Sequence, residues 1–290
     1  MIDPITAALS KVSIDAGLYL SKSMIGKVVG LADKVKNEKD LNTQIKEYLE
    51  STAKRCALVK TMFDEQPVQF RSIYEPVGVK KVGDKDSTNI SEREILWDDD
   101  LSRVVITDTQ GAGKSMFMRS LFLFAVEWRV PGGRLPIFCD LKKFNTFKDY
   151  SLNALVAEAF EPYLGEGSRD FATGILRKGN VFLILDGFDE IDPSIRRDVI
   201  VDILRKSDVQ GSKIFLSSRY NEHIDALDNY VVFEIDDIDL EKAKAIIRRV
   251  KFDEDEKTEF IEVLESRLFA EYNSIARHDA DYLFPLQNCP

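Results

Sequence analysis

Apolar positions recur at helical spacing over the first part of the chain. One stripe covers residues 5–31 and a second covers residues 41–63, with a polar segment at 37–40 between them. Apolar side chains spaced three and four residues apart lie on one face of a helix, so residues 1–66 are predicted to form a helical hairpin or small bundle. Because two helices bury little apolar surface by themselves, we expect this N-terminal helical module to pack on the main domain or on copies of itself.

Residues 67–102 change to a pattern rich in turn formers. Prolines and glycines punctuate the beginning of this stretch, and a polar run follows at 84–89. Such a composition is typical of turns and loops, so residues 67–102 are interpreted as a connector. One short extended piece is expected within it, at residues 70–79.

Strand-like and helix-like segments then alternate. Short apolar runs predict strands at residues 103–107, 135–141, 181–185, 213–217 and 230–235. Helical stripes and capping residues predict helices at 114–128, 151–163, 169–178 and 193–206. This alternation predicts an α/β fold over residues 103–238, in which helices sandwich a parallel sheet and ligands bind at the carboxyl ends of its strands.

From residue 239 the pattern is helical again, with apolar stripes at 240–250 and 260–268. The charged stretch 253–257 between them is interpreted as a solvated loop and helix start. Residues 282–290 are apolar and end abruptly, which suggests a missing continuation or a surface for a partner. Residues 239–290 are therefore interpreted as a C-terminal helical segment that is apparently truncated.

Length and charge narrow the class of protein. A chain of 290 residues can hold one α/β core and a smaller module. Its net charge of −10 argues against a general nucleic-acid surface, and no apolar run approaches the ~18 residues of a transmembrane helix. The first residues lack the basic segment and apolar core of a signal peptide. We therefore expect a cytoplasmic protein with no direct nucleic-acid binding and no transmembrane segment.

The cysteines and histidines indicate neither a disulfide framework nor a metal site. Cys56, Cys139 and Cys289 lie far apart, without the spacing of a disulfide framework or a metal site. His223 and His278 are the only histidines, and neither is near a cysteine in sequence. Buried free thiols in a reducing compartment are expected.

A glycine-containing turn follows the first predicted strand of the main domain, where the sequence reads DTQGAGKS from Asp108 to Ser115. In a phosphate-binding loop, glycines let main-chain N–H groups converge on phosphate oxygens, a lysine adds charge and a hydroxyl holds Mg²⁺. The helix that follows would point its positive end at the same anion. Asp108 stands where the general pattern has its first glycine, and its carboxylate would be unfavourable beside phosphates unless it points away. Nucleotide contacts are assigned to Gly111, Ala112, Gly113, Lys114, Ser115 and Met116.

Acidic and basic residues follow two other predicted strands. Asp186 ends an apolar strand and is expected to hold Mg²⁺ together with Ser115, while Asp189 or Glu190 would orient the attacking water. Arg219 follows the strand at 213–217, and its planar guanidinium suits a terminal phosphate. These residues predict a three-part site for a nucleotide.

Four motifs together resemble the NACHT family of nucleotide-switching ATPases, a branch of the signal-transduction ATPases with numerous domains (STAND). They are GAGKS at 111–115, RLPIF at 134–138, LDGFDEI at 185–191 and LSSR at 216–219. The resemblance covers about residue 104 to the end of the chain, and the acidic motif is its most specific part. Pro290 resembles the proline of the segment that closes over the adenine and begins the helical lid in this family.

The resemblance implies a switch. Members of the family are expected to rest closed with ADP, to bind ATP with Mg²⁺ and form homo-oligomers when a trigger acts, and to reset by slow hydrolysis. A helical module ahead of the domain is similar to the arrangement in bacterial NACHT proteins that defend against phage, in which the trigger would be a phage-derived or host protein. Asp108 is a departure from the family pattern that leaves the turnover rate open.

Two other functions stay open at this stage. One is a nucleotide-dependent assembly module with negligible hydrolysis, in which the nucleotide is a structural ligand and residues 1–66 bind a partner. The other is a small phosphate-loop kinase, which the acidic motif fits poorly.

Overall fold

The computed structural model describes residues 38–60, 66–83, 89–109, 111–128, 133–179, 181–201, 211–220, 224, 227, 229–250 and 253–268. The predicted helix at 5–31, the end of the predicted helix at 193–206, both histidines, Cys289 and the apolar segment 282–290 lie outside the described residues. The chain divides into two compact units, Met1–Leu58 with Pro76–Asp236, and Val59–Glu75 with Asp237–Pro290.

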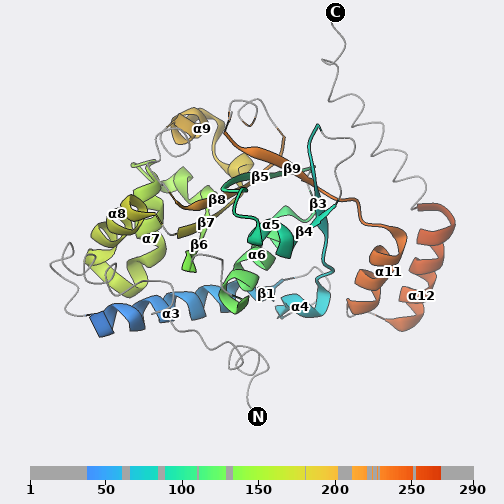
Figure 1. Cartoon of the computed structure of the whole chain (residues 1–290). Coiled ribbons are helices and arrows are strands. Elements are labelled where there is room, and N and C mark those ends of the chain that lie inside the picture. The colour runs from blue at the N-terminus through green and yellow to red at the C-terminus, as the bar shows by residue number, and fades with distance from the viewer. Residues whose placement is uncertain are drawn as a thin grey trace, which may run out of the picture. The chain divides into compact units, whose positions relative to one another are not determined.

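A seven-stranded sheet forms the centre of the first unit (Figure 1). In spatial order its strands are β4 (Ile90–Ser91), β3 (Gly78–Lys81), β9 (Val231–Ile235), β5 (Arg103–Thr107), β8 (Lys213–Ser218), β7 (Val181–Asp186) and β6 (Leu135–Asp140). The strands from β9 to β6 are parallel, whereas β3 is antiparallel to β9 and β4 is antiparallel to β3. The α/β fold predicted from the sequence is confirmed, with an antiparallel edge added to it.

The predicted strands of the main domain agree with the observed ones to within one residue at each end. Strand β7 is buried along Val181–Leu185, as expected for an apolar run covered on both faces. Strands β3 and β4 arise instead from the stretch interpreted as a connector. Strands of four and two residues are too short to leave a periodic signal, and for this reason the sequence pattern did not reveal them.

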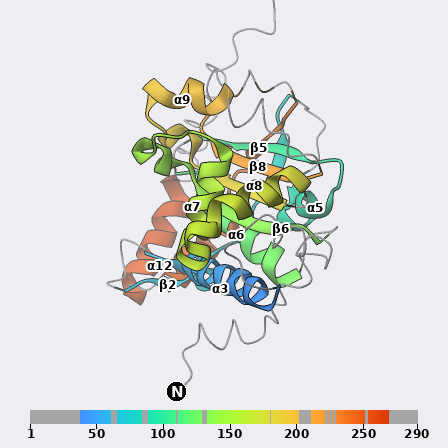
Figure 2. The ribbon, with the colours of Figure 1, turned by 90° about the vertical axis from the view of Figure 1, so that its left-hand side faces the viewer.

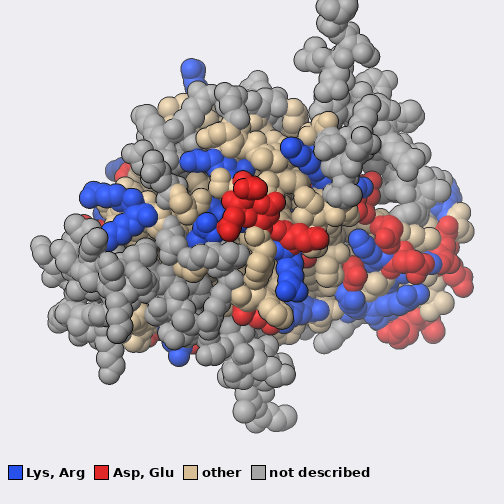
Figure 3. Space-filling model, in the orientation of Figure 1, with Lys and Arg blue, Asp and Glu red and all other residues tan. Residues whose placement is uncertain are grey.

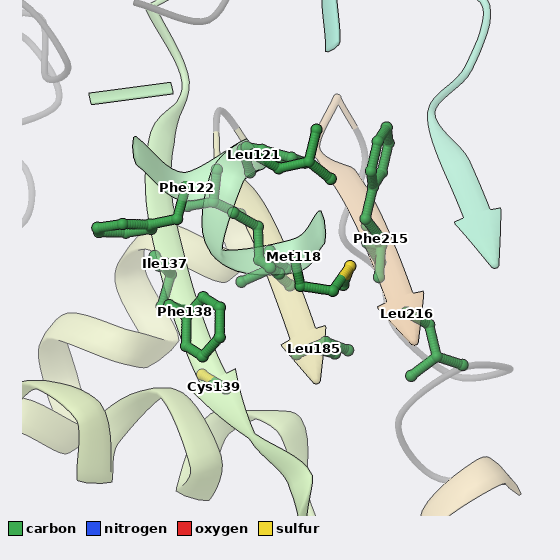
Figure 4. Close-up of a cluster of buried hydrophobic side chains, with 14 of the residues drawn as sticks. Met118, Leu121, Phe122, Ile137, Phe138, Cys139, Leu185, Phe215 and Leu216 are labelled. Carbon is green, nitrogen blue, oxygen red and sulfur yellow. The ribbon is translucent and has the colours of Figure 1, made fainter. Parts of the chain in front are cut away.

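Helix α6 (Lys114–Trp128) matches its predicted bounds and packs on the sheet. Figure 4 shows its apolar side chains against those of β6, β7 and β8. The labelled residues of this cluster are Met118, Leu121, Phe122, Ile137, Phe138, Cys139, Leu185, Phe215 and Leu216, all of them buried. This packing fixes the start of α6 relative to the ends of the parallel strands.

Other helices surround the sheet. Helix α9 (Pro193–Val199) lies on the opposite side of the sheet from α6 (Figures 1 and 2). Helix α7 (Leu152–Leu164) packs beside β6, and α8 (Ser168–Lys178) packs on α7. The short helices α5 (Glu92–Trp97) and η3 (Leu141–Thr146) precede β5 and follow β6. Caps define the starts of three of these helices, because Ser91, Ser151 and Asp192 each accept a hydrogen bond from a main-chain N–H of the first turn.

Helix α3 (Glu38–Cys56) belongs to the core of the first unit. The hydroxyl of Tyr48 accepts a hydrogen bond of 3.0 Å from the main-chain N–H of Phe138, on the edge strand β6. The Tyr48 ring also lies 4.2 Å from that of Phe160 on α7, centroid to centroid. Part of the predicted N-terminal module therefore packs on the main domain. The helix ends at Cys56, seven residues before the end of the predicted stripe, because β1 (Leu58–Val59) follows and pairs with β2 (Val68–Gln69).

The second unit contains α4 (Phe70–Ile73), α11 (Leu240–Arg249), α12 (Glu254–Val263) and the π-helical turn η7 (Leu264–Leu268). Arg249 joins α11 to the residues after α4, because its Nη1 donates to the Tyr74 carbonyl at 2.8 Å and lies 2.6 Å from Oε2 of Glu75. The extended piece expected at 70–79 is wrong in its first half, since residues 70–73 form a helical turn.

Two further expectations concern the thiols and the surface. Cys56 and Cys139 are buried free thiols, as predicted, and burial raises the pKa of each to about 12. None of the helices in the described part of the chain combines the length and apolar character needed to span a membrane. Figure 3 shows a group of acidic side chains near the middle of the visible face, with lysines and arginines scattered around it.

Candidate functional site

The carboxyl ends of β5, β8 and β7 meet at one edge of the sheet. The three strands are parallel neighbours, and Thr107 at the end of β5 is level with Ser218 at the end of β8. Strand β8 therefore separates the strand that leads into the glycine turn from the strand that leads into the acidic motif. In open α/β sheets this edge, where the order of connections reverses, is the usual place for a ligand.

The glycine turn needs its glycines for their backbone angles. Gly111 and Gly113 have φ angles of 87° and 94°, which side-chain-bearing residues rarely adopt. No heavy atom lies within 4 Å of a Cβ built at either position, so space alone would not require glycine. The same open space lets a ligand approach the main chain at the start of α6, where N–H groups and the helix dipole favour an anion.

Lys114 is bound to its own loop. Its Nζ donates to the carbonyl of Asp108 at 2.8 Å and to that of Thr109 at 2.6 Å. Burial lowers the pKa of Lys114, while the nearby carboxylates of Asp189 and Asp108 act in the opposite direction. The Asp108 carboxylate accepts a hydrogen bond of 2.5 Å from the N–H of Thr109. The lysine thus lies where it can reach both the loop and the acidic motif.

Asp186 accepts hydrogen bonds from hydroxyl groups on two neighbouring segments. Its Oδ1 accepts hydrogen bonds from Oγ of Ser115 at 3.2 Å and from Oγ of Ser217 at 2.5 Å. Ser217 in turn accepts a hydrogen bond of 2.8 Å from the N–H of Gly187. Burial raises the pKa of Asp186, and the two hydroxyl hydrogen bonds oppose that rise. A carboxylate and a hydroxyl side by side are oxygen ligands of the kind that Mg²⁺ prefers.

Asp189 and Arg219 form an ion pair between the ends of β7 and β8. Nε of Arg219 lies 2.8 Å from Oδ2 of Asp189, and the main-chain N–H of Arg219 donates to Oδ1 at 3.1 Å. The Asp189 side chain is only 15% exposed, whereas that of Arg219 is 49% exposed. The structure thus brings together two predicted site residues that the sequence had assigned to separate tasks.

Glu190 is more open to solvent, with 49% of its side chain exposed. A Cβ added at Gly187 would lie 3.4 Å from Cδ of Glu190, so the glutamate side chain lies over this glycine. Oε2 of Glu190 is 3.8 Å from Nζ of Lys142, on η3. Glu190 therefore presents a partly exposed carboxylate beside the end of β7.

Three residues of the site were missed in the sequence. Ser217 stands within the LSSR motif and could have been noticed because it precedes Arg219 on a buried strand. Asn145 and Arg196 hold the acidic loop through main-chain groups, which leave no sequence signal.

Ala112 and Met116 are half-buried in the loop and in the first turn of α6, and Gln110 between Thr109 and Gly111 lies outside the described residues. Among the described residues, no group of three or more His, Cys, Asp or Glu side chains gathers to hold a metal.

Comparison with known proteins agrees with this geometry. The family model for the NACHT domain matches residues 102–254, slightly more than half of the 290 residues. A comparison with curated proteins gave no significant match. The matched range begins just before β5 and contains every residue of the edge described above. The loop that holds Lys114, the acidic loop after β7 and the arginine after β8 are thus parts of a P-loop nucleotide-binding module of the STAND type, and the chain belongs to the NACHT family.

Proposed function

We propose that the protein is a switch that binds ATP or ADP together with Mg²⁺ and hydrolyses ATP slowly. The observation that carries the proposal is the hydrogen bond of 3.2 Å from Ser115 to Asp186. It joins the first turn of α6 to the end of β7 across the intervening strand β8. A hydroxyl and a carboxylate in this relation suit a metal ion that accompanies a phosphate chain.

The residues present fit a phosphate chain. Gly111 and Gly113 leave the main chain accessible, and the first turn of α6 supplies N–H groups. Lys114 supplies a cation whose present partners are two carbonyls of its own loop. Because ammonium groups bind phosphate oxygens more strongly than neutral carbonyls, we expect Lys114 to exchange these partners for the phosphates.

Mg²⁺, when bound, would neutralise part of the charge that develops on the transferred phosphate. Ser115 and Asp186 would hold it. The carboxylate of Asp186 is kept in place by Ser217, which also binds the N–H of Gly187. This support orients Asp186 before any ligand arrives, and pre-organised ligands lose less entropy on binding.

The environments of the two other carboxylates favour different tasks for them. Asp189 is largely buried and already paired with Arg219, so its task is to hold that guanidinium. Glu190 is partly exposed and lies over Gly187, where its carboxylate can accept a proton from an attacking water. We assign the water-orienting role to Glu190 and the positioning role to Asp189.

The pair between Arg219 and Asp189 supports a switch. A terminal phosphate would compete with Asp189 for the guanidinium, because a phosphate oxygen and a carboxylate oxygen suit the same planar donor. ATP and ADP would then leave different contacts at the ends of β7 and β8. We propose that this difference controls homo-oligomerisation, which ATP would favour.

The first experiment identifies the nucleotide. Denaturing the purified protein and separating the released small molecules should give ADP or ATP in about equimolar amount. Hydrolysis should fall at least about tenfold in Glu190→Gln with nucleotide binding retained. Steady hydrolysis that neither Glu190→Gln nor Asp189→Asn affects would exclude both carboxylates from the reaction.

The second experiment separates the switch from a structural use of the nucleotide. Mass determination in solution should give a larger assembly with a slowly hydrolysed ATP analogue than with ADP. An unchanged mass together with negligible hydrolysis would favour an assembly module. The ion pair of Arg219 with Asp189 also bears on this second candidate, because a phosphate that does not displace Asp189 would leave the contacts at the ends of β7 and β8 unchanged.

A role in bacterial defence against phage is supported by the family resemblance of the motifs. Its test is a plaque count on bacteria that carry the protein. The parent should lower the count and Lys114→Ala should not. Equal counts with the parent and with an empty vector, over a panel of phages, would remove this role.

A further inference from the structure

The side chain of Asn145 spans two main-chain groups of the acidic loop. Its Nδ2 donates to the carbonyl of Glu190 at 3.0 Å, and its Oδ1 accepts from the N–H of Asp192 at 2.8 Å. Asn145 lies on η3, which follows the edge strand β6, whereas its partners follow β7. An amide side chain can make this contact because it carries a donor and an acceptor in one plane, much as a peptide group does.

A second side chain holds the same loop. Nη2 of Arg196, on α9, donates to the carbonyl of Asp189 at 2.7 Å, and its Nε donates to the carbonyl of Ile191 at 2.9 Å. Four consecutive residues, 189–192, therefore each have one main-chain group bound by Asn145 or Arg196. Buried Ile191 lies at the middle of the segment and anchors it in the core.

The position of Asn145 concerns Glu190 in particular. Its bond to the Glu190 carbonyl fixes the peptide that follows the Glu190 side chain. Lys142, on the same helical turn as Asn145, lies 3.8 Å from the Glu190 carboxylate. Two residues of η3 thus contact Glu190: Asn145 binds its main chain and Lys142 lies near its carboxylate. Asp189 is instead held by Arg196 and Arg219.

We propose that Asn145 is a positioning residue for Glu190, which it holds over Gly187 where the attacking water is to be oriented. The inference rests on the catalytic role of Glu190 proposed above. Small displacements of a catalytic group can lower rates by one to two orders of magnitude, which sets the size of the expected effect. The hydrogen bonds of the Asn145 side chain go to the main chain of the acidic loop, at Glu190 and Asp192.

Two variants test the contribution of the donor and of the acceptor of the Asn145 side chain. Asn145→Asp keeps an oxygen that can accept from the Asp192 N–H, but it places a carboxylate against the Glu190 carbonyl. Asn145→Ala removes both contacts. We expect each variant to lower the hydrolysis rate constant kcat about tenfold or more, with the dissociation constant for nucleotide changed less than about twofold.

Thr146→Ala is the matched control. Thr146 is the neighbour of Asn145 on η3, and its hydroxyl donates to the carbonyl of Lys143 at 2.9 Å within the same turn. This variant removes a hydrogen bond of η3 without removing a hydrogen bond to the acidic loop. Its kcat should stay within about twofold of the parent.

A double-mutant cycle tests whether Asn145 acts through Glu190. In a Glu190→Gln background, Asn145→Asp should lower kcat by less than about twofold, because the group that it positions is already lost. An equal loss in both backgrounds would overturn the proposal. If Glu190→Gln slows hydrolysis and Asn145→Asp does not, the role of Asn145 fails alone. If Glu190→Gln has no effect on hydrolysis, the proposed roles of Glu190 and Asn145 both fail.

Amide hydrogen exchange supplies a reading that does not depend on hydrolysis. The Asp192 N–H should exchange at the parental rate in Asn145→Asp and at least about tenfold faster in Asn145→Ala. Parental protection of Asp192 in Asn145→Ala would show that the contact does not hold the loop and would overturn the proposal.

Discussion

Lysines at the two ends of the parallel strands make similar contacts for different purposes. Lys114 follows β5 and donates to the carbonyls of Asp108 and Thr109. Its partners lie six and five residues before it, on the same exposed turn. Breaking these contacts disturbs only the turn, so a phosphate can replace the carbonyls without displacing a helix or a strand.

Lys213 begins β8 at the opposite end of the sheet, and its side chain is fully buried. Its Nζ donates to the carbonyl of Leu96 at 3.0 Å and to that of Asp98. These carbonyls lie at the end of α5, more than 110 residues earlier in the chain. The contact therefore joins α5 to the sheet, and its loss would remove this donor from the carbonyl of buried Leu96.

The difference between the two lysines lies in their partners. Burial lowers the pKa of both, and it lowers that of Lys213 to about 8. A lowered pKa alone would have suggested two functional sites. The open glycine turn around Lys114 distinguishes a group that can bind a ligand from one that supports the fold.

The largest effect is expected at Lys114, the lysine that we propose to bind phosphate. Lys114→Ala should weaken nucleotide binding about a thousandfold, equivalent to about 4 kcal/mol, because a charge-assisted contact to phosphate is lost. The melting temperature of the nucleotide-free protein should hardly change. Nucleotide content after purification and a binding titration would measure the loss. Parental nucleotide content in Lys114→Ala would mean that the site lies elsewhere.

Lys213→Ala should have the complementary effect, a loss of about 3 kcal/mol in the free energy of unfolding. The carbonyls of Leu96 and Asp98 each lose one hydrogen bond, and a cavity replaces the side chain. Nucleotide affinity per folded molecule should be unchanged. Denaturant unfolding gives the energy, and Lys46→Ala is the control, because Lys46 is an exposed lysine that pairs with Glu50 on its own helix. If Lys213→Ala lowered nucleotide affinity without lowering the free energy of unfolding, the different roles assigned to Lys114 and Lys213 would be wrong.

A smaller effect concerns the pH dependence of stability. The pKa of Lys213 is about 8 in the folded protein and near its ordinary 10.5 in the unfolded chain, so the unfolded chain binds more protons between these values. Relative to Lys213→Met, the parent should therefore gain about 1 to 2 kcal/mol of stability as pH increases from 7.5 to 9.5. The buried thiols of Cys56 and Cys139, whose pKa is raised, lower the stability of both proteins alike over this range, so the difference between the two curves isolates Lys213. Parallel pH curves for the parent and the variant would contradict the assignment. The range stops at 9.5 because burial also raises the pKa of Tyr48 and Tyr230, which lowers stability at higher pH.

The sheet could be predicted from sequence because its strands are buried. A run such as 181–185 has one physical explanation when capped helices flank it, and its bounds were found within one residue. The antiparallel strands β3 and β4 could not be found in the same way. They are short, and β3 is placed by pairing with β9, which is about 150 residues further along the chain, while β4 pairs with β3. The contact of Tyr48 with β6 also joins distant parts of the chain, because its two residues are 90 positions apart.

The site was predictable where it depends on local motifs. The glycine turn and the acidic motif indicated Ser115 and Asp186, and the structure places their side chains in contact. Their roles as metal ligands stay predictions, as do the catalytic roles of Asp189, Glu190 and Arg219. The ion pair of Asp189 with Arg219 and the bonds of Asn145 could not be read from sequence, because they depend on the order of strands and on the path of η3.

The smallest effect compares serines at the two ends of β8. Ser217, at the carboxyl end, donates to Asp186, whereas Ser212, just before the strand, accepts a hydrogen bond of 3.4 Å from the N–H of Val181. Ser217→Ala should raise the Mg²⁺ concentration that half-saturates nucleotide binding about fivefold, equivalent to about 1 kcal/mol. Ser212→Ala should leave it unchanged.

Binding of a fluorescent nucleotide, titrated with Mg²⁺, measures both serine variants. Ser217→Thr keeps the hydroxyl and should restore the parental Mg²⁺ requirement, which a general loss of packing would not allow. An equal shift in Ser212→Ala and Ser217→Ala would mean that both serines act through the stability of β8. A shift confined to Ser217→Ala would mean that one strand supports the fold at its amino end and the metal ligand at its carboxyl end.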